Sequence, residues 1–151
     1  MNHGTAEQSF EALTFGLQDE LFAIDAGLVR EILDVIPITG VPGARPFVNG
    51  LINVRGKVVP LADLRVKFGM RQPADTIDTR IVVVEIDLRG EAAAVGIVAD
   101  KVHEVAEIDG RSIEKTPDLG MRWRPEFVKG IGKSNGRFII IPDLNRIFSS
   151  D

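Results

Sequence analysis

The side chains that most often carry out chemistry are scarce in this chain. It contains two histidines, no cysteine and no tyrosine. His3 lies in a polar N-terminal stretch, and His103 stands next to Glu104 within a strand-like segment, where a surface position is a better interpretation than a general base. The histidines do not have the spacing of metal ligands, and no thiolate chemistry is available. The sequence therefore predicts no catalytic residue, no metal and no cofactor.

A strand-like segment with one acidic residue in an apolar row is a better candidate for function. Strict alternation in this segment places Val29, Glu31, Leu33 and Val35 on one face. A buried glutamate is costly unless it is paired. Two interpretations therefore stay open. The row lies at the edge of an exposed groove, with Val29 as an apolar contact and Glu31 at a polar rim, or it belongs to a core strand with Glu31 at its wet end.

Arg55 is the second candidate, because it stands at the expected tip of a hairpin. The segment Phe47–Phe68 has the pattern of a strand, a two-residue turn at Arg55-Gly56, a second strand and a short helix capped by Asp63. Any polar residue suits a turn. An exposed arginine is also a good interface anchor, since it can bind a carboxylate through two hydrogen bonds.

The elements that position these residues are repeated along the chain. Phe127–Phe148 aligns with Phe47–Phe68 at an offset of eighty positions without a gap, and Phe22–Ile32 matches Val95–Val105 at an offset of 73. The identical pairs in the longer match are Phe47/Phe127, Val48/Val128, Gly50/Gly130, Gly56/Gly136, Asp63/Asp143, Leu64/Leu144 and Phe68/Phe148. Shared glycines and apolar residues indicate a repeated structural unit. Arg55 is not shared, which favours a functional role for it.

The repeat predicts an all-β fold of two five-stranded barrels packed together, with short helical turns. No segment has the length of a helical crossover between parallel strands, so antiparallel pairing is expected. We expect residues 1–9 to form a flexible tail and residues 10–151 one domain, with lobe one at about 10–70 and lobe two at about 79–149. A lobe of this size has a marginal core alone, so the lobes should share an apolar seam. One larger sandwich is the alternative.

Composition excludes several classes of partner. The 151 residues carry a net charge of −4 and a pI near 5.2, which gives no support to nucleic-acid binding. No apolar run approaches the roughly 20 residues that cross a bilayer, so direct membrane insertion is not expected. The first residues lack the basic and apolar segments of a signal peptide. A cytoplasmic protein is the simplest expectation.

The sequence resembles the CheW family of chemotaxis coupling proteins. The residues that carry the resemblance are GLINVRGKVVPLADLRVKFG (Gly50–Gly69), VREI (Val29–Ile32) and AVGIVADKVHEV (Ala94–Val105), in the family's order and spacing. The resemblance extends from about Phe10 to Phe148. It implies two intertwined five-stranded barrels similar to SH3 domains.

Membership would imply a non-enzymatic adaptor in signal transduction. Such a protein joins the cytoplasmic tip of methyl-accepting chemoreceptors to the regulatory domain of the histidine kinase CheA. Receptor binding in the family uses a groove between the lobes, and the matching positions are Val29, Glu31 and Arg55. We expect the protein to reach the membrane-associated receptor array only through these partners.

The resemblance also suggests a second contact region. Kinase contact in the family uses outer apolar surfaces of the barrels, and a lateral contact in ring-like arrays uses a segment that matches the loop from Ile113 to Leu119. Glu114 is acidic where some relatives have a basic residue, which implies a partner of matching charge. Kinase or lateral contacts are therefore expected at Ile113, Glu114 and Leu119.

Two other classes of function remain open on sequence grounds. A duplicated barrel can bind a small ligand or a nucleotide, and a change in thermal stability with a nucleotide panel would reveal it. A small enzyme is the weaker alternative, given the scarcity of catalytic side chains.

Overall fold

The computed structural model describes residues 9–115 and 125–150, and ten strands dominate them. The first half of the chain contains β1 (Ser9–Leu17), β2 (Glu20–Asp25), β3 (Val29–Asp34), β4 (Val48–Val54) and β5 (Lys57–Ala62). The second half contains β6 (Arg80–Leu88), β7 (Glu91–Ala99), β8 (Lys101–Asp109), β9 (Val128–Ser134) and β10 (Arg137–Pro142). Two short α-helices, α1 (Leu64–Lys67) and α2 (Leu144–Phe148), follow β5 and β10, and 3-10 turns lie at η2 (Ala26–Leu28), η3 (Gly110–Ser112) and η4 (Pro125–Phe127).

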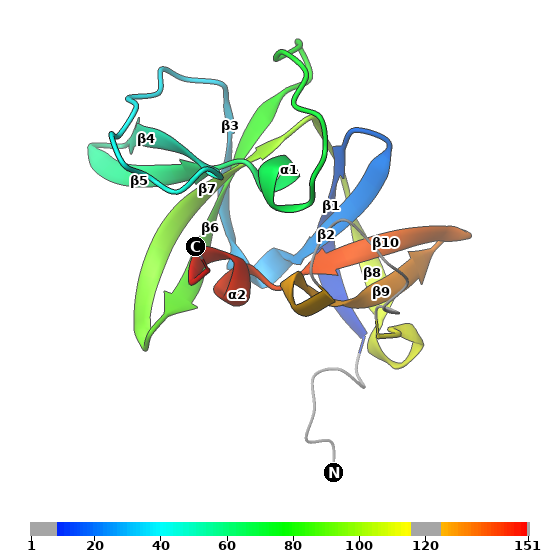
Figure 1. Ribbon diagram of the computed structural model, residues 1–151. Helices are drawn as coiled ribbons and strands as arrows, with labels where there is room; N and C mark the ends of the chain where they lie inside the picture. Colours follow the sequence, from blue (N-terminus) through cyan, green and yellow to red (C-terminus); the bar gives the residue numbers. More distant parts are fainter. Residues whose placement is uncertain (1–8, 116–124, 151) are drawn as a thin grey trace.

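The strands form two five-stranded sheets, which confirms the all-β fold class. Sheet A has the order β8-β1-β2-β10-β9, and sheet B has the order β3-β6-β7-β5-β4. Replacing each strand of sheet A by its counterpart in the other half gives the order of sheet B. Figure 1 shows β4 and β5 of sheet B on one side of the molecule, β8, β9 and β10 of sheet A on the other, and α1 near the middle.

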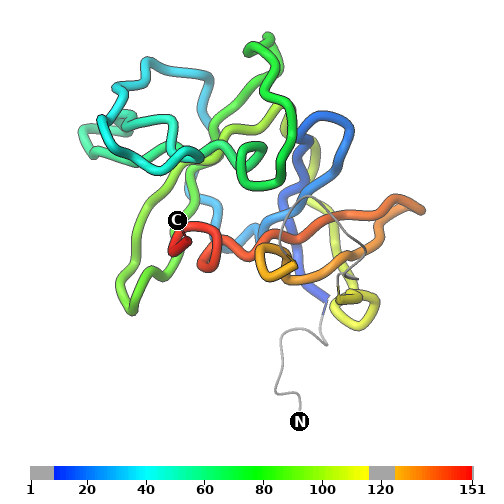
Figure 2. The backbone as a smooth tube through the Cα atoms, viewed as in Figure 1, coloured from blue at the N-terminus to red at the C-terminus, as the bar shows by residue number. Residues whose placement is uncertain are grey.

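Each sheet takes strands from both halves of the chain, so the expected lobe boundaries at about 10–70 and 79–149 do not coincide with the sheets. The chain supplies β1 and β2 to sheet A, β3 to β7 to sheet B, and β8 to β10 to sheet A again. In Figure 2 the blue first hairpin accordingly lies beside the yellow and orange segments of the second half. The physical reason is that β3 finds its pairing partner in β6 rather than in β2, because η2 turns the chain away from sheet A.

Two of the strand pairs are parallel, which the sequence-based expectation of antiparallel pairing missed. They join β2 to β10 and β5 to β7. Between β2 and β10 the chain forms strands of both sheets, and between β5 and β7 it forms α1 and β6, so neither parallel pair needs a long helical crossover. The remaining ladders are antiparallel.

The sheets are packed and curved but are not closed hydrogen-bonded barrels. In the described residues, the outer strands of each sheet share no ladder, and an isolated bridge connects the two ends instead. Thr39 pairs with Leu51 in sheet B through two backbone hydrogen bonds of 2.8 and 2.9 Å, and Glu114 pairs with Ile131 in sheet A at 2.8 and 3.0 Å. The prediction of two barrels is corrected in this respect.

The closing segments explain two glycines of the repeat. A Cβ atom at Gly50, where φ is +149°, would lie 2.2 Å from the carbonyl oxygen of Thr39. A Cβ atom at Gly130 would lie 2.3 Å from Cγ2 of Ile113. A side chain at either position would therefore push away the segment that closes its sheet.

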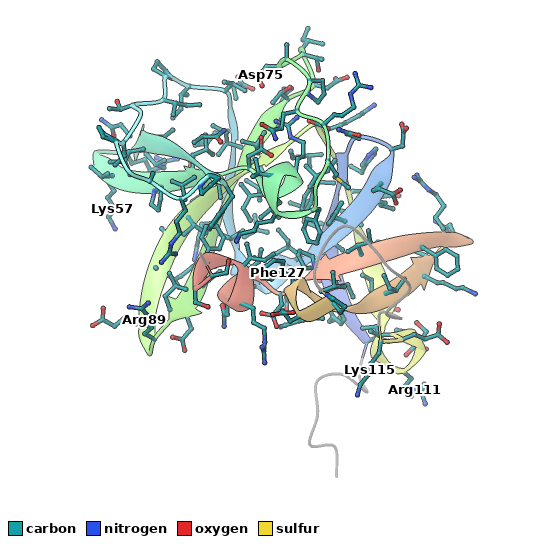
Figure 3. The ribbon with its side chains drawn as sticks, in the orientation of Figure 1. Lys57, Asp75, Arg89, Arg111, Lys115 and Phe127 are labelled. Atoms are coloured by element: carbon teal, nitrogen blue, oxygen red, sulfur yellow. The ribbon has the colours of Figure 1, made fainter. Side chains whose placement is uncertain are left out.

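The predicted apolar seam is confirmed as the largest cluster of buried side chains, which draws on both sheets. Its aromatic members include Phe15 and Phe22 of sheet A, with ring centroids 5.9 Å apart, and Phe47 and Phe148, at 5.8 Å. Figure 3 shows Phe127 at the centre of the molecule between the sheets. Each sheet also has a smaller core of its own, which includes Ile52 and Leu61 in sheet B.

The turn chemistry agrees with the prediction. Arg55 and Gly56 have φ values of 53° and 84°, as a two-residue turn of the hairpin type requires. Asp63 caps α1, because its Oδ1 accepts a hydrogen bond of 3.0 Å from the backbone N–H of Arg65. Gly69 then ends the helical turn with φ at 66°.

Candidate protein-binding surface

The structure brings together two of the three predicted receptor-site residues. Nε of Arg55 lies 3.0 Å from Oε2 and 3.3 Å from Oε1 of Glu31, although 24 positions separate them in the sequence. The Arg55 side chain is 81% exposed and that of Glu31 is 24% exposed. The hydrogen bond to Glu31, followed by its charge, raises the pKa of Arg55. Since the pair is open to solvent, it fixes local geometry and contributes little to folding.

Two different elements hold this ion pair. Arg55 stands at the tip of the β4–β5 hairpin, where the side-chain oxygen of Asn53 accepts a hydrogen bond of 2.8 Å from the N–H of Gly56. Glu31 lies on β3, the outer strand at the other end of sheet B. The pair therefore spans the two ends of the sheet, near the bridge between Thr39 and Leu51.

Val29 lies on the same strand but faces the shared core. A register shift between Val29 and Glu31 in the ladder with β6 separates their directions. Val29 is half-buried against the seam, and Leu33 is half-buried against the core of sheet B. Val29 and Leu33 therefore lie on the inner face of an outer strand, Glu31 is paired at the edge of the sheet, and Val35 lies beyond the strand and is 40% exposed. This arrangement is closer to the core-strand interpretation than to the groove interpretation, and it leaves only part of Val29 accessible.

A shallow hollow lies next to the ion pair. Its volume is about 680 Å³, and it is lined by Ile36, Pro37, Thr39, Leu51, Ile52, Asn53, Gly56 and Val58. Most of these side chains are apolar. The hollow therefore offers a mainly hydrophobic surface beside the charged group Glu31–Arg55, an arrangement typical of a protein-binding site.

Exposed apolar side chains around this hollow were missed by the sequence analysis. Val58 on β5 lines the hollow and is 71% exposed, and Ile32, Ile38 and Val41 are exposed by 43%, 42% and 40%. A signal was available for Val58, because consecutive residues in a strand point to opposite faces. Since Val59 is buried in sheet B, its neighbour Val58 must face outward.

The residues predicted for the second contact region are placed differently from one another. Ile113 is half-buried and packs against the small core of sheet A, above Gly130. Glu114 pairs with Ile131 only through its backbone, and its side chain is exposed. Leu119 lies outside the described residues. Ile113 therefore has a structural role in the small core of sheet A, and Glu114 is the residue of the predicted second contact region whose side chain is accessible.

The described residues offer no group of three or more side chains that could hold a metal ion. His103 is exposed on β8. Among the helices of the described residues, none has the length and apolar character that spanning a bilayer requires.

With this geometry established, comparison with known proteins decides the family. The family model described as "CheW-like domain" matches residues 11–151. The chain belongs to the CheW-like family. The chemotaxis protein CheW of Rhizobium meliloti is 31% identical over 93% of this chain and 88% of its own length. That of Helicobacter pylori is 32% identical over 96% of this chain and 85% of its own length.

A solved structure of the family agrees with the fold. The crystal structure of the scaffolding protein TtCheW from Thermoanaerobacter tengcongensis superposes with a TM-score of 0.83 at 35% sequence identity, and the match covers 95% of each chain. The resemblance that the sequence suggested is therefore confirmed, and the paired sheets are the fold of a CheW scaffolding protein.

Proposed function

We propose that this protein is a non-enzymatic adaptor that couples chemoreceptors to the histidine kinase CheA. Membership of the CheW-like family supports a scaffolding role, and the family model covers almost the whole described chain. The single observation that carries the proposal is the ion pair between Glu31 and Arg55, presented beside an apolar hollow. In this proposal the protein works in the cytoplasm and reaches the receptor array through its partners.

The receptor tip would dock on the surface formed by Val29, Glu31 and Arg55. Arg55 is the best placed of the three to act as an anchor, because its guanidinium extends into solvent while Glu31 holds its orientation. Its second edge stays available for a carboxylate or a backbone carbonyl of the partner. The accessible part of Val29 adds apolar contact next to the seam.

The regulatory domain of CheA would use apolar surface. Exposed apolar side chains provide it on β3 (Ile32), on β5 (Val58) and in the connection between β3 and β4 (Val35, Ile38 and Val41), and Val58 also lines the hollow next to the receptor site. Glu114 is a separate candidate for lateral contact, and Ile113 would support it from below. Coupling requires that some of these contacts differ between signalling states, since equal contacts would shift no equilibrium.

The test is charge reversal in the ion pair with controls taken from the repeat. Glu31→Lys and Arg55→Glu should each abolish capture by a receptor cytoplasmic fragment, and the double variant should recover part of it. Glu104 and Asn135 occupy the equivalent positions of the other copy, and Glu104 is exposed on β8. Glu104→Lys and Asn135→Glu should therefore bind receptor normally.

Circular dichroism must show that all variants are folded, and capture by the CheA regulatory domain serves as a second readout. Normal receptor capture by both Glu31→Lys and Arg55→Glu would show that the receptor site lies elsewhere.

A further inference from the structure

A buried arginine connects the two sheets at one place where the chain crosses between them. Arg65 of α1 is only 5% exposed. Its Nε and Nη2 lie 2.8 and 2.7 Å from the two carboxylate oxygens of Asp63, in the two-pronged geometry of a strong ion pair. Its Nη1 lies 2.8 Å from Oδ1 of Asp100. The guanidinium thus bridges two carboxylates.

Asp100 extends this network to the other sheet. It is the residue between β7 of sheet B and β8 of sheet A, so the chain changes sheets here. Its Oδ2 accepts a hydrogen bond of 2.6 Å from the backbone N–H of Gln18, and its own N–H donates to the carbonyl of Gly16 at 2.9 Å. Gln18 forms the β1–β2 turn of sheet A. An unbroken chain of polar contacts therefore runs from α1 to the tip of sheet A.

The chemistry at position 100 requires a carboxylate. Both partners of its side chain, the guanidinium of Arg65 and the N–H of Gln18, are donors. Only a carboxylate offers an acceptor at each oxygen, whereas asparagine would present its NH₂ group to one of the two donors. Asp100 is thus matched to a bridging role that an amide of the same size cannot fill.

Among the described residues, the other crossover between the sheets has no such network. It lies between β2 and β3. In the repeat, Gly27 of this crossover corresponds to Asp100 of the β7–β8 crossover, and Asn145 of α2 corresponds to Arg65 of α1. Gly27 has no side chain, and Asn145 is exposed on α2. Asp143, the counterpart of Asp63, accepts a hydrogen bond of 3.2 Å from the N–H of Arg146 and makes only a 3.8 Å contact with that residue's side chain. The fold therefore forms this crossover without a buried ion pair.

We propose that Arg65 and Asp100 form a clamp that fixes the position of sheet A relative to sheet B. The seam between the sheets is apolar, and apolar contact has little directional preference. A bridging guanidinium with defined hydrogen-bond geometry selects one arrangement among those that bury similar area. A role of buried ionic groups in conformational specificity has precedent in other proteins.

The clamp also has a consequence that rests on the proposed function. The receptor site and the exposed apolar surface lie on sheet B and its β3–β4 connection, whereas Glu114 closes sheet A. A partner that contacts both sheets requires them in a fixed relation. Arg65 is then a positioning residue for coupling, although it touches neither partner.

Distance measurement between the sheets tests the clamp directly. The chain has no cysteine, so two introduced cysteines accept spin labels without further changes. Lys57→Cys and Arg137→Cys place labels at the exposed starts of β5 and β10, and Figure 3 shows Lys57 at the outer end of sheet B. In this background, Asp100→Asn and Arg65→Lys should each add a second, shifted peak to the electron–electron distance distribution.

A matched control comes from an ion pair within a single sheet. Arg30 on β3 and Glu85 on β6 are joined at 2.8 Å, as close as Arg65 and Asp100, but both belong to sheet B. Glu85→Gln should leave the distance distribution unchanged. Distributions identical to the wild type in both Asp100→Asn and Arg65→Lys would overturn the clamp, and so would an equal broadening in the control.

A reconstituted kinase assay separates this inference from the proposed function. In Asp100→Asn, stimulation of the kinase by receptor should fall about tenfold, a typical size for coupling between sites, while capture by each partner alone stays close to that of the wild type. A second distance peak with normal stimulation would retain the clamp but reject its role in coupling. Absence of receptor capture by the wild type would reject the proposed function and leave the distance result valid.

Discussion

The two hairpin–helix units, Phe47–Phe68 and Phe127–Phe148, have the same backbone but different polar side chains. Their turns have φ values of 53° and 84° in one and 51° and 77° in the other. Both units start at a buried phenylalanine and end in a helix capped by aspartate. Two of the differences replace an arginine: Arg55 at the hairpin tip corresponds to Asn135, and Arg65 in the helix corresponds to Asn145.

This comparison separates what the fold requires from what one copy adds. Residues present in both units fill the seam, close the sheets or cap the helices. Arg55 and Arg65 are absent from the second unit, yet that unit folds in the same way. Their contacts, to Glu31 and to Asp100, lead out of the unit to other elements. An arginine found in only one copy therefore points to a task located at that copy.

Removal of a shared core residue should have the largest effect on stability. Phe47 is 1% exposed, packs edge-to-face on Phe148 and lies under the ammonium group of Lys67, whose Nζ is 4.6 Å from the ring centre. Phe47→Ala should lower the free energy of unfolding by about 3–5 kcal/mol, because it leaves a cavity in the seam. Phe138→Ala is the matched control, since that ring is 63% exposed, and its effect in denaturant unfolding should be small.

Breaking the buried ion pair should come next. Arg65→Ala leaves the carboxylate of Asp63 buried without its charged partner, which should cost about 3 kcal/mol or more in unfolding free energy. Asn145→Ala makes the corresponding change in the exposed position of α2 and should cost less than about 0.5 kcal/mol. Equal effects of the two substitutions would contradict the difference between the helices.

The charge of Arg65 should make this effect independent of pH near neutrality. Hydrogen bonding to Asp63 raises the pKa of Arg65, although burial acts in the opposite direction. A group whose pKa is raised on folding contributes its stabilisation below the unfolded pKa and loses it only as the pH rises through the folded value. Between about pH 7 and about pH 9, Arg65 stays charged in both the folded and the unfolded protein. Its titration should therefore not alter the difference in unfolding free energy between the wild type and Arg65→Ala, as measured by urea unfolding across this range.

The closing glycines provide a smaller effect with a clear asymmetry. Gly50→Ala would force a Cβ atom against a backbone oxygen at positive φ, and it should destabilise the protein by about 1–3 kcal/mol. Gly130→Ala should cost less, because its Cβ would meet the side chain of Ile113 at 2.3 Å but would stay 3.0 Å from the nearest backbone oxygen, that of Glu114. Gly40→Ala has open space around its new Cβ and serves as the control in thermal unfolding. A larger loss in Gly130→Ala than in Gly50→Ala would contradict this order.

Exchange of the hairpin tips should have the smallest effect on stability, and it should impair receptor binding in only one of the two variants. Arg55→Asn and Asn135→Arg each copy one tip into the other, and both residues have a side chain that tolerates the turn. Neither substitution should move the unfolding midpoint, because Arg55 is exposed. Only Arg55→Asn should lose receptor capture. Loss of capture in Asn135→Arg as well would show that the two tips do not differ in function.

Much of the fold could be predicted because it depends on local signals. The turn at Arg55-Gly56, the cap at Asp63 and the repeat of glycines and phenylalanines are readable from neighbouring residues. The lobe boundaries and the parallel pairs were not predictable in this way. A strand carries the same alternating pattern whichever partner it pairs with, so the sequence does not state that β1 and β2 join the sheet of β8 to β10.

The candidate site was also predicted only in part from the sequence. Glu31 and Arg55 were each selected from the sequence, by an unusual acidic position and by a difference between repeats. The ion pair between them was not predicted, because they are 24 positions apart in the sequence and lie on elements at opposite ends of sheet B. The buried position of Arg65 was also missed, since an arginine on a short helix is normally expected in solvent.

The local geometry of this protein follows from short stretches of sequence: its turns, its caps and the repeated unit that fills the seam. These depend on the conformational limits of a few adjacent residues. The tertiary structure alone decided how the strands are distributed between the sheets and which charged groups meet, at Glu31–Arg55 and at Asp63–Arg65–Asp100. Pairing between distant strands depends on which apolar surfaces can be buried together, and that choice is made by the whole chain at once.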